Sequence, residues 1–322
     1  MSKIIINKKI KSFKSTILIP GDKSLSIRWV LFASLANGIS KARNLLKSED
    51  VFAAINAIKK LGIKVTHDKD ETKIYGKGIN GYEYRKDIII NAQNSGTLGR
   101  LILGILIDTP YPIKILGDKS LSKRDFKRVT DPLSKFGAKF TLKKSHNLPL
   151  TISGSSKLDP ITYTENKGSA QCKSSVIFAA MKARGTTIIK AKKSRNHTEL
   201  LCKYLGLPVL VKSKKIYDEI KIKQIKKIKK LNYDIPSDIS SSTFFIGLTV
   251  LSPNSKLTIK NVNINPSRTG VITILRRMGV SIEFTNEKIY KGEKKANITI
   301  RSPKKLKAIN CPSKFNSSAI DE

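Results

Sequence analysis

One pattern of strand, helix, strand, helix and two strands recurs four times along this chain of 322 residues. The repeats have comparable starts, at intervals of 71, 75 and 71 residues, at Ser24, Ser95, Ala170 and Ser241. Four copies in phase are not expected by chance among ordinary α/β segments. The repetition predicts an α/β protein built from repeated units that pack on one another, because no single unit can bury its own apolar face.

The ends of the predicted helices have characteristic residues. Each start carries Ser, Thr, Asn or Gly, as N-caps do, and the second helix of each repeat ends at a glycine, as helix C-termini do. These glycines are Gly62, Gly137, Gly206 and Gly279. Helix starts present unpaired N–H groups and a partial positive charge, so several of them converging on one cleft would bind phosphate and carboxylate.

Composition narrows the functional classes. Lys and Arg total 62 against 24 Asp and Glu, a net charge of +38, which favours acidic partners. The charge could also reflect nucleic-acid binding or a compositional bias. Aromatic residues are only 7% of the chain, so nucleic-acid bases would find few aromatic side chains to stack on.

No apolar run reaches the ~18 residues of a membrane span and no signal peptide is recognisable, so we expect a cytoplasmic protein. The three cysteines show no metal-ligand spacing, and we expect reduced thiols and no metal site.

Three repeats begin with residues suited to anions. In the first, Lys23 and Ser24 stand at a turn, and Arg28 lies one helical turn later on the same face. An ammonium, a hydroxyl and a guanidinium at that spacing can hold one anionic group. The alternative is a capped helix whose Lys and Arg are simply solvated.

The second repeat has the same design. Asn94-Ser95-Gly96-Thr97 precedes Arg100 by one turn, and Gly96 would let a ligand approach the backbone. The loop from Gly117 to Arg124 then adds basic groups, of which Arg124 could grip a carboxylate with two hydrogen bonds. An ordinary capped turn followed by a solvated charge run would produce the same pattern.

The third repeat offers hydroxyl and amide groups. Ser169-Ala170-Gln171 stands at a helix start, where it could bind phosphate or sugar-like hydroxyls, or could act only as a cap. Ser194 opens a polar turn before the next helix, and His197 in that turn is a possible base, although a capping or surface histidine is the more common case.

In this order the motifs resemble the EPSP synthase (3-phosphoshikimate 1-carboxyvinyltransferase) family. The resemblance extends from Ile17 to Glu322 and includes Ser194-Arg195-Asn196-His197-Thr198-Glu199 and Asn265-Pro266-Ser267-Arg268-Thr269-Gly270. It implies a two-domain inverse α/β prism, the enolpyruvyl transferase fold, built from βαβαββ units. Residues 21–238 would form the N-terminal (upper) domain with three repeats, and residues 1–20 with 239–322 an incomplete C-terminal (lower) domain.

The resemblance also implies a reaction. The family transfers the enolpyruvyl group of phosphoenolpyruvate to the 5-hydroxyl of shikimate 3-phosphate through a tetrahedral intermediate, without metal or organic cofactor, and we expect a monomer. The implied catalytic residues are Asp321, as proton acceptor, and Lys23. Shikimate 3-phosphate would contact Lys23, Ser24, Arg28, Ser169, Ala170, Gln171, Ser194 and Asp321. Phosphoenolpyruvate would contact Lys23, Asn94, Gly96, Arg124 and Gln171.

The resemblance leaves open questions at the end of the chain. The family has six repeats, so we expect that this chain lacks most of the fifth and all of the sixth, and that it has little activity alone. We also expect the lower domain to be poorly stable by itself.

A sister enzyme that uses UDP-N-acetylglucosamine carries a cysteine in the loop near Arg124, and Gly117 to Arg128 contains none. Two further hypotheses are a nucleic-acid-binding module and a non-catalytic remnant of the enzyme.

Overall fold

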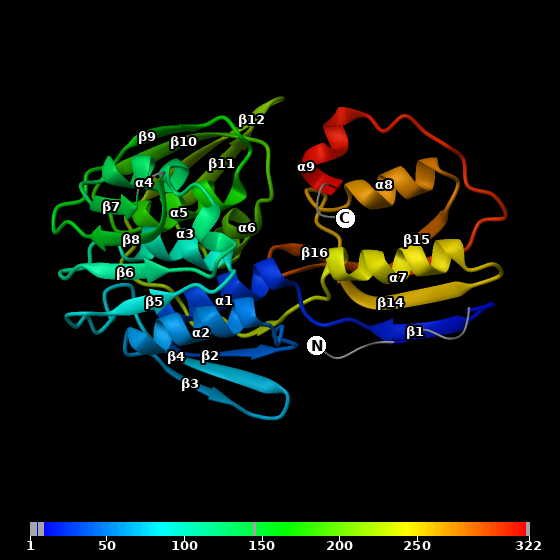
Figure 1. The fold of residues 1–322 in the computed structure, drawn as a ribbon, viewed down its shortest axis with the longest axis horizontal. Coiled ribbons are helices and arrows are strands. Elements are labelled where there is room, and N and C mark those ends of the chain that lie inside the picture. The colour runs from blue at the N-terminus through cyan, green and yellow to red at the C-terminus, as the bar shows by residue number, and fades with distance from the viewer. Residues whose placement is uncertain (1–4, 6–9, 144–145, 320–322) are drawn as a thin grey trace. The chain divides into compact units, whose positions relative to one another are not determined.

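The computed structural model describes residues 5, 10–143 and 146–319, and the chain divides into two compact units (Figure 1). The larger unit is Gly21–Ile235, and the smaller unit combines Met1–Pro20 with Pro236–Glu322. Among the described residues, no helix is both long enough and apolar enough to cross a membrane. Each unit is a mixed α/β structure, as the repeat pattern predicts.

The larger unit contains three four-stranded sheets among its described residues. The first has the order β13 (Tyr233–Asp234), β2 (Asn37–Arg43), β4 (Glu71–Lys77), β3 (Lys64–His67). The second has the order β5 (Ile89–Asn91), β6 (Ile113–Leu116), β8 (Asn147–Ser153), β7 (Lys139–Lys143). The third has the order β11 (Val209–Ser213), β12 (Tyr217–Lys223), β10 (Thr186–Lys192), β9 (Thr162–Glu165). In all three, one edge strand runs parallel to its neighbour and the other pairs are antiparallel.

Two helices accompany each sheet. They are α1 (Lys23–Leu35) and α2 (Glu49–Lys60), α3 (Gly96–Ile105) and α4 (Lys127–Ser134), and α5 (Ala170–Ala180) and α6 (His197–Tyr204), with a 3₁₀ turn at Leu121–Lys123. The order strand, helix, strand, helix, two strands is therefore the one that the sequence predicts for the second and third repeats.

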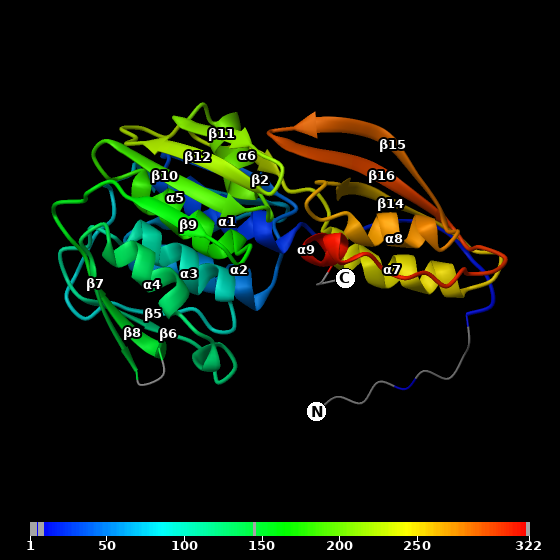
Figure 2. The ribbon, with the colours of Figure 1, turned by 90° about the horizontal axis from the view of Figure 1, so that it is seen from above.

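Helices α1 and α5 form the centre of the larger unit (Figure 2). Every residue from Leu25 to Leu35 and from Cys172 to Ala180 is buried. Their sequences lack a polar face, which is typical of helices surrounded by protein on all sides. Helix α3 packs closely on α5, because a Cβ on Gly104 would come 2.0 Å from the carbonyl oxygen of Ser175.

The helix ends confirm one prediction and refine another. The four repeat-closing glycines have φ angles of +81°, +110°, +67° and +91°, the left-handed conformation that glycine adopts without strain. At the first helix of each repeat, Ser95 and Ser169 cap α3 and α5 as expected. Helix α1 and its counterpart in the smaller unit are instead capped by Asp22 and Asp238, whose carboxylates accept from backbone N–H groups of the first turn.

The smaller unit has one four-stranded sheet in its described part, with the order β1 (Lys14–Leu18), β14 (Lys256–Asn263), β16 (Glu293–Arg301), β15 (Ser281–Tyr290). Helices α7 (Ile239–Leu251) and α8 (Gly270–Arg277) pack against it (Figure 2), and a 3₁₀ turn at Ser313–Phe315 leads into α9 (Asn316–Ala319). The core consists of aliphatic side chains from the sheet, α7 and α8, for example Ile246, Ile259, Ile272, Ile282 and Ile298.

The edge strands of two repeats are exchanged. Strand β1 precedes α1 in the chain but pairs in parallel with β14 of the smaller unit, Lys14 opposite Lys256. Strand β13 precedes α7 but pairs in parallel with β2 of the larger unit, Tyr233 opposite Ala42. The repeat pattern by itself does not reveal this exchange, because both strands stand at the repeat position that predicts pairing with the next segment. The family resemblance does imply it, since it assigns residues 1–20 to the lower domain and residues 21–238 to the upper one.

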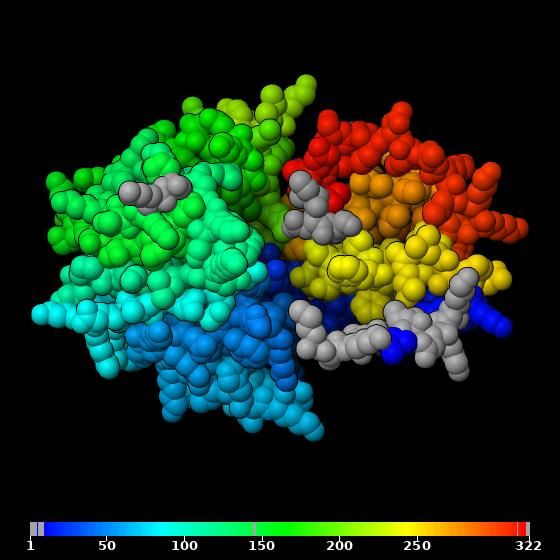
Figure 3. Space-filling model, in the orientation of Figure 1, coloured from blue at the N-terminus to red at the C-terminus, as the bar shows by residue number. Residues whose placement is uncertain are grey.

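Helix α7 differs from its counterparts α1 and α5 in exposure. It is as apolar around its whole circumference, yet Phe244 is 83% exposed and Leu251 is 75% exposed, with Phe245 and Leu248 partly exposed beside them. In Figure 3 the yellow segment that includes α7 lies at the surface of the smaller unit. An apolar face of this kind is unusual for a helix of a stable unit.

Candidate active site

The first turns of helices α3 and α5 lie close together, and side chains of the two helices are hydrogen-bonded to each other. Arg100 in the second turn of α3 donates from Nη1 to Oε1 of Gln171, at 2.8 Å. Nε2 of Gln171 in turn donates to Oγ1 of Thr97, at 3.1 Å. The oxygen and the nitrogen of the Gln171 amide are therefore both used by α3, which fixes the side chain at the entrance of two positively polarised helix starts.

The loop that follows β6 brings a second guanidinium to this place. Nη2 of Arg124 donates to Oδ1 of Asn94 at 3.1 Å. Asp118 holds the loop by accepting from the N–H of Leu121, at 2.7 Å. Gly96 lies under both arginines, because a Cβ added there would come 2.8 Å from Nη1 of Arg100 and 3.1 Å from Nη1 of Arg124. The structure thus brings together Asn94, Gly96, Arg124 and Gln171.

Arg100 stacks on the ring of Phe126, with 5.0 Å between guanidinium carbon and ring centroid. Burial lowers the pKa of Arg100, and the neighbouring Arg124 and Arg128 lower it further against the opposing effect of Cys172. A guanidinium stays protonated even so. Three arginines near two helix starts make this part of the larger unit strongly attractive to anions.

Lys23 and Ser24 are the first two residues of α1 rather than a preceding turn. Nζ of Lys23 lies 3.1 Å from Oδ2 of Asp50 at the start of α2, and the Lys23 side chain is 52% exposed. The carboxylate of Asp50 keeps the ammonium group near the helix start. Sequence reasoning did not connect these two residues, because they belong to different helices.

Arg28 lies deeper than its motif suggests, at 3% exposure. Its Nη1 donates to the carbonyl oxygen of Ser24 at 3.1 Å, one turn earlier on α1. Its Nε and Nη2 donate to hydroxyls of Thr198 and Ser174. Arg28 is therefore not the solvated arginine that the sequence allowed as an alternative.

The hydroxyls of the third repeat have mixed environments. Oγ of Ser169 accepts from the N–H of Cys172 at 3.2 Å, so the serine is a cap. Ala170 is the half-buried first residue of α5. Oγ of Ser194 is buried without a hydrogen-bond partner in the described part of the chain, the condition of a group that a water or ligand oxygen would satisfy. His197 is neither a surface residue nor a cap: it is buried in the first turn of α6, and Asn196 occupies the cap position.

Two features that the sequence predicts, Asp321 and the motif that contains Arg268, come from the segment Pro236–Glu322. Asp321 lies outside the described residues. Arg268, from the predicted Asn265–Gly270 motif, is 2% exposed, and its Nη2 lies 3.2 Å from Oδ1 of Asp238 and 2.6 Å from Oγ of Ser240. This arginine therefore fixes the start of α7.

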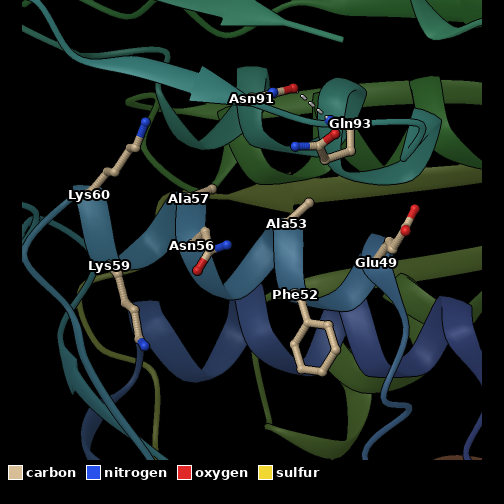
Figure 4. Close-up of a pocket in the computed structure, with 9 residues that line it drawn as sticks. All are labelled: Glu49, Phe52, Ala53, Asn56, Ala57, Lys59, Lys60, Asn91 and Gln93. Atoms are coloured by element: carbon tan, nitrogen blue, oxygen red, sulfur yellow. Dashed lines mark hydrogen bonds between the residues drawn. The ribbon is translucent and has the colours of Figure 1, made fainter. Parts of the chain in front are cut away.

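A groove of about 630 Å³ borders the site in the larger unit (Figure 4). One wall is the face of α2 that carries Phe52, Ala53 and Asn56, and the other carries Asn91 and Gln93. Oδ1 of Asn91 accepts from the N–H of Gln93 at 2.9 Å. Glu49 and Gln93, which line the groove, directly precede Asp50 and Asn94 in the chain. The groove therefore reaches the neighbours of the residues that contact Lys23 and Arg124.

Comparison with known proteins decides the family. The sequence profile of EPSP synthase (3-phosphoshikimate 1-carboxyvinyltransferase) matches residues 7–317. The chain belongs to the EPSP synthase family. It is 40% identical over 318 residues to the 3-phosphoshikimate 1-carboxyvinyltransferase of Thermoanaerobacter sp. (strain X514), covering 98% of this chain and 73% of that protein. The protein of the same name from Vesicomyosocius okutanii is 39% identical over 324 residues, covering 100% of this chain and 72% of that protein.

The fold agrees with this family. An EPSP synthase structure from Acinetobacter baumannii superposes with a TM-score of 0.87 at 34% identity, covering 97% of this chain and 69% of that one. The resemblance that the sequence motifs indicate is thus confirmed at the level of the family. The sequence motifs did not predict the contact of Asp50 with Lys23, that of Thr198 with Arg28, or the link between Arg100 and Gln171. Each of these contacts depends on a partner from another element of the fold.

Proposed function

We propose that this chain binds shikimate 3-phosphate and phosphoenolpyruvate, side by side, in the arrangement required for transfer of the enolpyruvyl group to the 5-hydroxyl of shikimate 3-phosphate. One structural observation supports the proposal in addition to the family assignment. Gln171, expected at both substrates, is joined to the α3 start by Arg100 and Thr97. Residues expected at phosphoenolpyruvate therefore adjoin residues expected at shikimate 3-phosphate.

The charges suit two anionic ligands. Arg124 and Arg100, beside the start of α3, would face the carboxylate and phosphate of phosphoenolpyruvate, and Gly96 leaves room for the ligand against the backbone. Ser169 and Ser194, at the start of α5 and before α6, would face the phosphate of shikimate 3-phosphate. Arg28 would hold the same molecule by its charge. Lys23, kept near the start of α1 by Asp50, would contact both ligands.

The chemistry is a balanced addition and elimination. The 5-oxygen bonds to C2 of phosphoenolpyruvate while its proton is taken up by a base and C3 gains a proton to become a methyl group. Loss of a proton from C3 and of phosphate from C2 then restores the double bond. Fixed cations stabilise such a reaction by facing the charged groups without reorganising. Asp321 would accept the hydroxyl proton.

Binding is the first test, because it depends directly on the residues described above. Calorimetric titration of the 322-residue chain with shikimate 3-phosphate should show saturable binding, at least tenfold tighter than that of shikimate, which lacks the phosphate. Lys23→Met should weaken it at least tenfold. Lys139→Met, at the exposed start of β7, makes the same charge change and should leave it intact. Equal affinity for shikimate, or equal effects of the two substitutions, would contradict the proposal.

A second titration separates the sister reaction. UDP-N-acetylglucosamine should not bind, in keeping with the absence of cysteine between Gly117 and Arg128. Binding of this nucleotide sugar with no binding of shikimate 3-phosphate would move the chain to the other enolpyruvyl transferase. Retention on DNA at physiological salt with neither ligand bound would favour the nucleic-acid alternative.

A further inference from the structure

Three helices meet at the guanidinium of Arg28. Nε of Arg28, on α1, donates to Oγ1 of Thr198 on α6, with 2.8 Å between the atoms. Nη2 of Arg28 donates to Oγ of Ser174 on α5, at 3.2 Å. Because Nε and Nη2 lie on one edge of the planar group, two acceptors on that edge set both the position and the plane of the guanidinium.

The two hydroxyls also hold each other. Oγ of Ser174 and Oγ1 of Thr198 are 2.7 Å apart, a distance at which one donates to the other. Thr198 is 0% exposed and Ser174 is 1% exposed, so water does not compete for these contacts. A buried hydroxyl with fixed partners is a more rigid acceptor than one at the surface.

Three of the acceptors of Arg28 are neutral oxygens. The hydroxyls of Thr198 and Ser174 and the carbonyl of Ser24 orient the cation, but unlike a carboxylate they bring no negative charge to it. Hydrogen bonds to neutral oxygens restrict the rotation of a guanidinium without themselves neutralising its charge. Such preorganisation raises affinity by lowering the entropy cost of binding.

We infer that Thr198, assisted by Ser174, is a positioning residue that fixes the guanidinium of Arg28 for recognition of shikimate 3-phosphate. Thr198 does not need to touch the ligand. The inference rests on the proposed function, since Arg28 is expected at that substrate. It adds that the affinity for the substrate depends on a hydroxyl from α6, a helix of the third repeat, acting on an arginine of the first.

The test compares three variants of the 322-residue chain by titration with shikimate 3-phosphate. Thr198→Val keeps the shape and removes the acceptor, and should weaken binding about tenfold, equivalent to about 1.4 kcal/mol. Thr198→Ser restores a hydroxyl and should bind within about threefold of the unsubstituted chain. Ser174→Ala should give an intermediate loss and serves if Thr198→Val does not fold.

A matched control separates positioning from stability. Thr187 on β10 is also buried, and its hydroxyl accepts from the N–H of Ile161, at 3.3 Å. Thr187→Val removes a comparable buried hydrogen bond and should leave the affinity for shikimate 3-phosphate unchanged. Phosphoenolpyruvate affinity, measured with shikimate 3-phosphate saturating, should be the same in Thr198→Val as in the unsubstituted chain.

The outcomes are distinct. If the unsubstituted chain binds shikimate 3-phosphate and Thr198→Val binds it equally well, the inference is wrong and the proposed function stands. If Thr198→Ser is as weak as Thr198→Val, or Thr187→Val is as weak as either, the hydroxyl does not act on Arg28 and the inference is also wrong. If the unsubstituted chain does not bind the ligand at all, the proposed function fails and the inference falls with it.

Discussion

Lys173 and Glu199 form an ion pair inside the larger unit, with 2.6 Å between Nζ and Oε1 and side-chain exposures of 0% and 4%. The pair joins α5 to α6 one residue away from the hydroxyl pair of Ser174 and Thr198. Two consecutive residues on each helix therefore make polar contacts in the interior. The ion pair fixes the spacing of the helices on which the contacts of Arg28 depend.

Removing one partner of this pair should be costly. Lys173→Met leaves the buried carboxylate of Glu199 without its cation, and we expect the free energy of unfolding to fall by about 3–5 kcal/mol. Urea unfolding monitored by fluorescence measures this. The double variant Lys173→Met with Glu199→Leu should recover most of the loss, because it leaves no buried charge.

A second ion pair provides the control for that measurement. Lys182 and Asp108 are also 2.6 Å apart, but the Asp108 side chain is 26% exposed. Lys182→Met should therefore cost less, about 1–3 kcal/mol, since water can reach the remaining carboxylate. Equal losses in Lys173→Met and Lys182→Met would show that the first pair is more hydrated than the structure indicates.

Two glycines of α3 should respond differently to the same substitution. A Cβ on Gly96 meets the ends of the flexible Arg100 and Arg124 side chains, whereas one on Gly104 meets the backbone oxygen of Ser175 at 2.0 Å. Gly96→Ala should fold normally and weaken phosphoenolpyruvate binding about tenfold by displacing the guanidinium groups. Gly104→Ala should lower the free energy of unfolding by several kcal/mol, because α3 and α5 must separate. Thermal unfolding of both variants, with ligand titration of Gly96→Ala, tests this contrast.

Stability should decline in alkaline solution through a buried thiol. Burial raises the pKa of Cys202 well above its ordinary value of 9.0, and the nearby Glu199 raises it further. Above about pH 9 the unfolded chain releases this proton while the folded chain retains it, so the folded state binds more protons and stability falls as pH rises. The contribution should be about 1.4 kcal/mol per pH unit until the folded thiol titrates.

The comparison of variants isolates that contribution. The unfolding free energy of the unsubstituted chain minus that of Cys202→Ala should decrease between about pH 9 and pH 10.5. Cys311→Ala, which removes a cysteine at an exposed position, is the control for the loss of a thiol as such. A constant difference for Cys202→Ala would mean that this thiol ionises as readily in the folded chain.

The two units should unfold separately, the smaller one first. Trp29 is the single tryptophan of the chain, is 1% exposed, and donates from Nε1 to the carbonyl oxygen of Leu231 within the larger unit. Its fluorescence therefore reports on that unit alone. The smaller unit leaves Phe244 and Leu251 of α7 exposed, so the loss of helical circular dichroism in urea should begin at lower concentration than the change in fluorescence. Coincident transitions would contradict this.

Much of the local structure could be predicted from the sequence because it depends on neighbouring residues. The glycines at Gly62 and Gly279 and the caps at Ser95 and Ser169 are local requirements of helix ends. The apolar circumference of α1 likewise predicts burial. Lys173 could not be predicted in the same way, since a lysine near a helix start is usually solvated and its partner Glu199 is on another helix.

The candidate site likewise combines residues that the sequence places together with contacts between separate elements. Asn94, Gly96 and Arg124 belong to one repeat, and the sequence places them near each other. The environment of Arg28 depends on hydroxyls from the third repeat, and that of Lys23 on Asp50, which belongs to α2. Contacts between elements distant in sequence are set by packing, which periodicity alone does not determine.

The exchanged edge strands have a consequence for how the chain folds as it is synthesised. Strand β1 leaves the ribosome ahead of the larger unit, but Lys14 pairs with Lys256, and this partner appears only after the whole larger unit has been made. The larger unit is one continuous segment that ends with its own edge strand β13, so it can fold as soon as that strand emerges. Strand β1 therefore remains without its sheet until a complete unit has formed behind it.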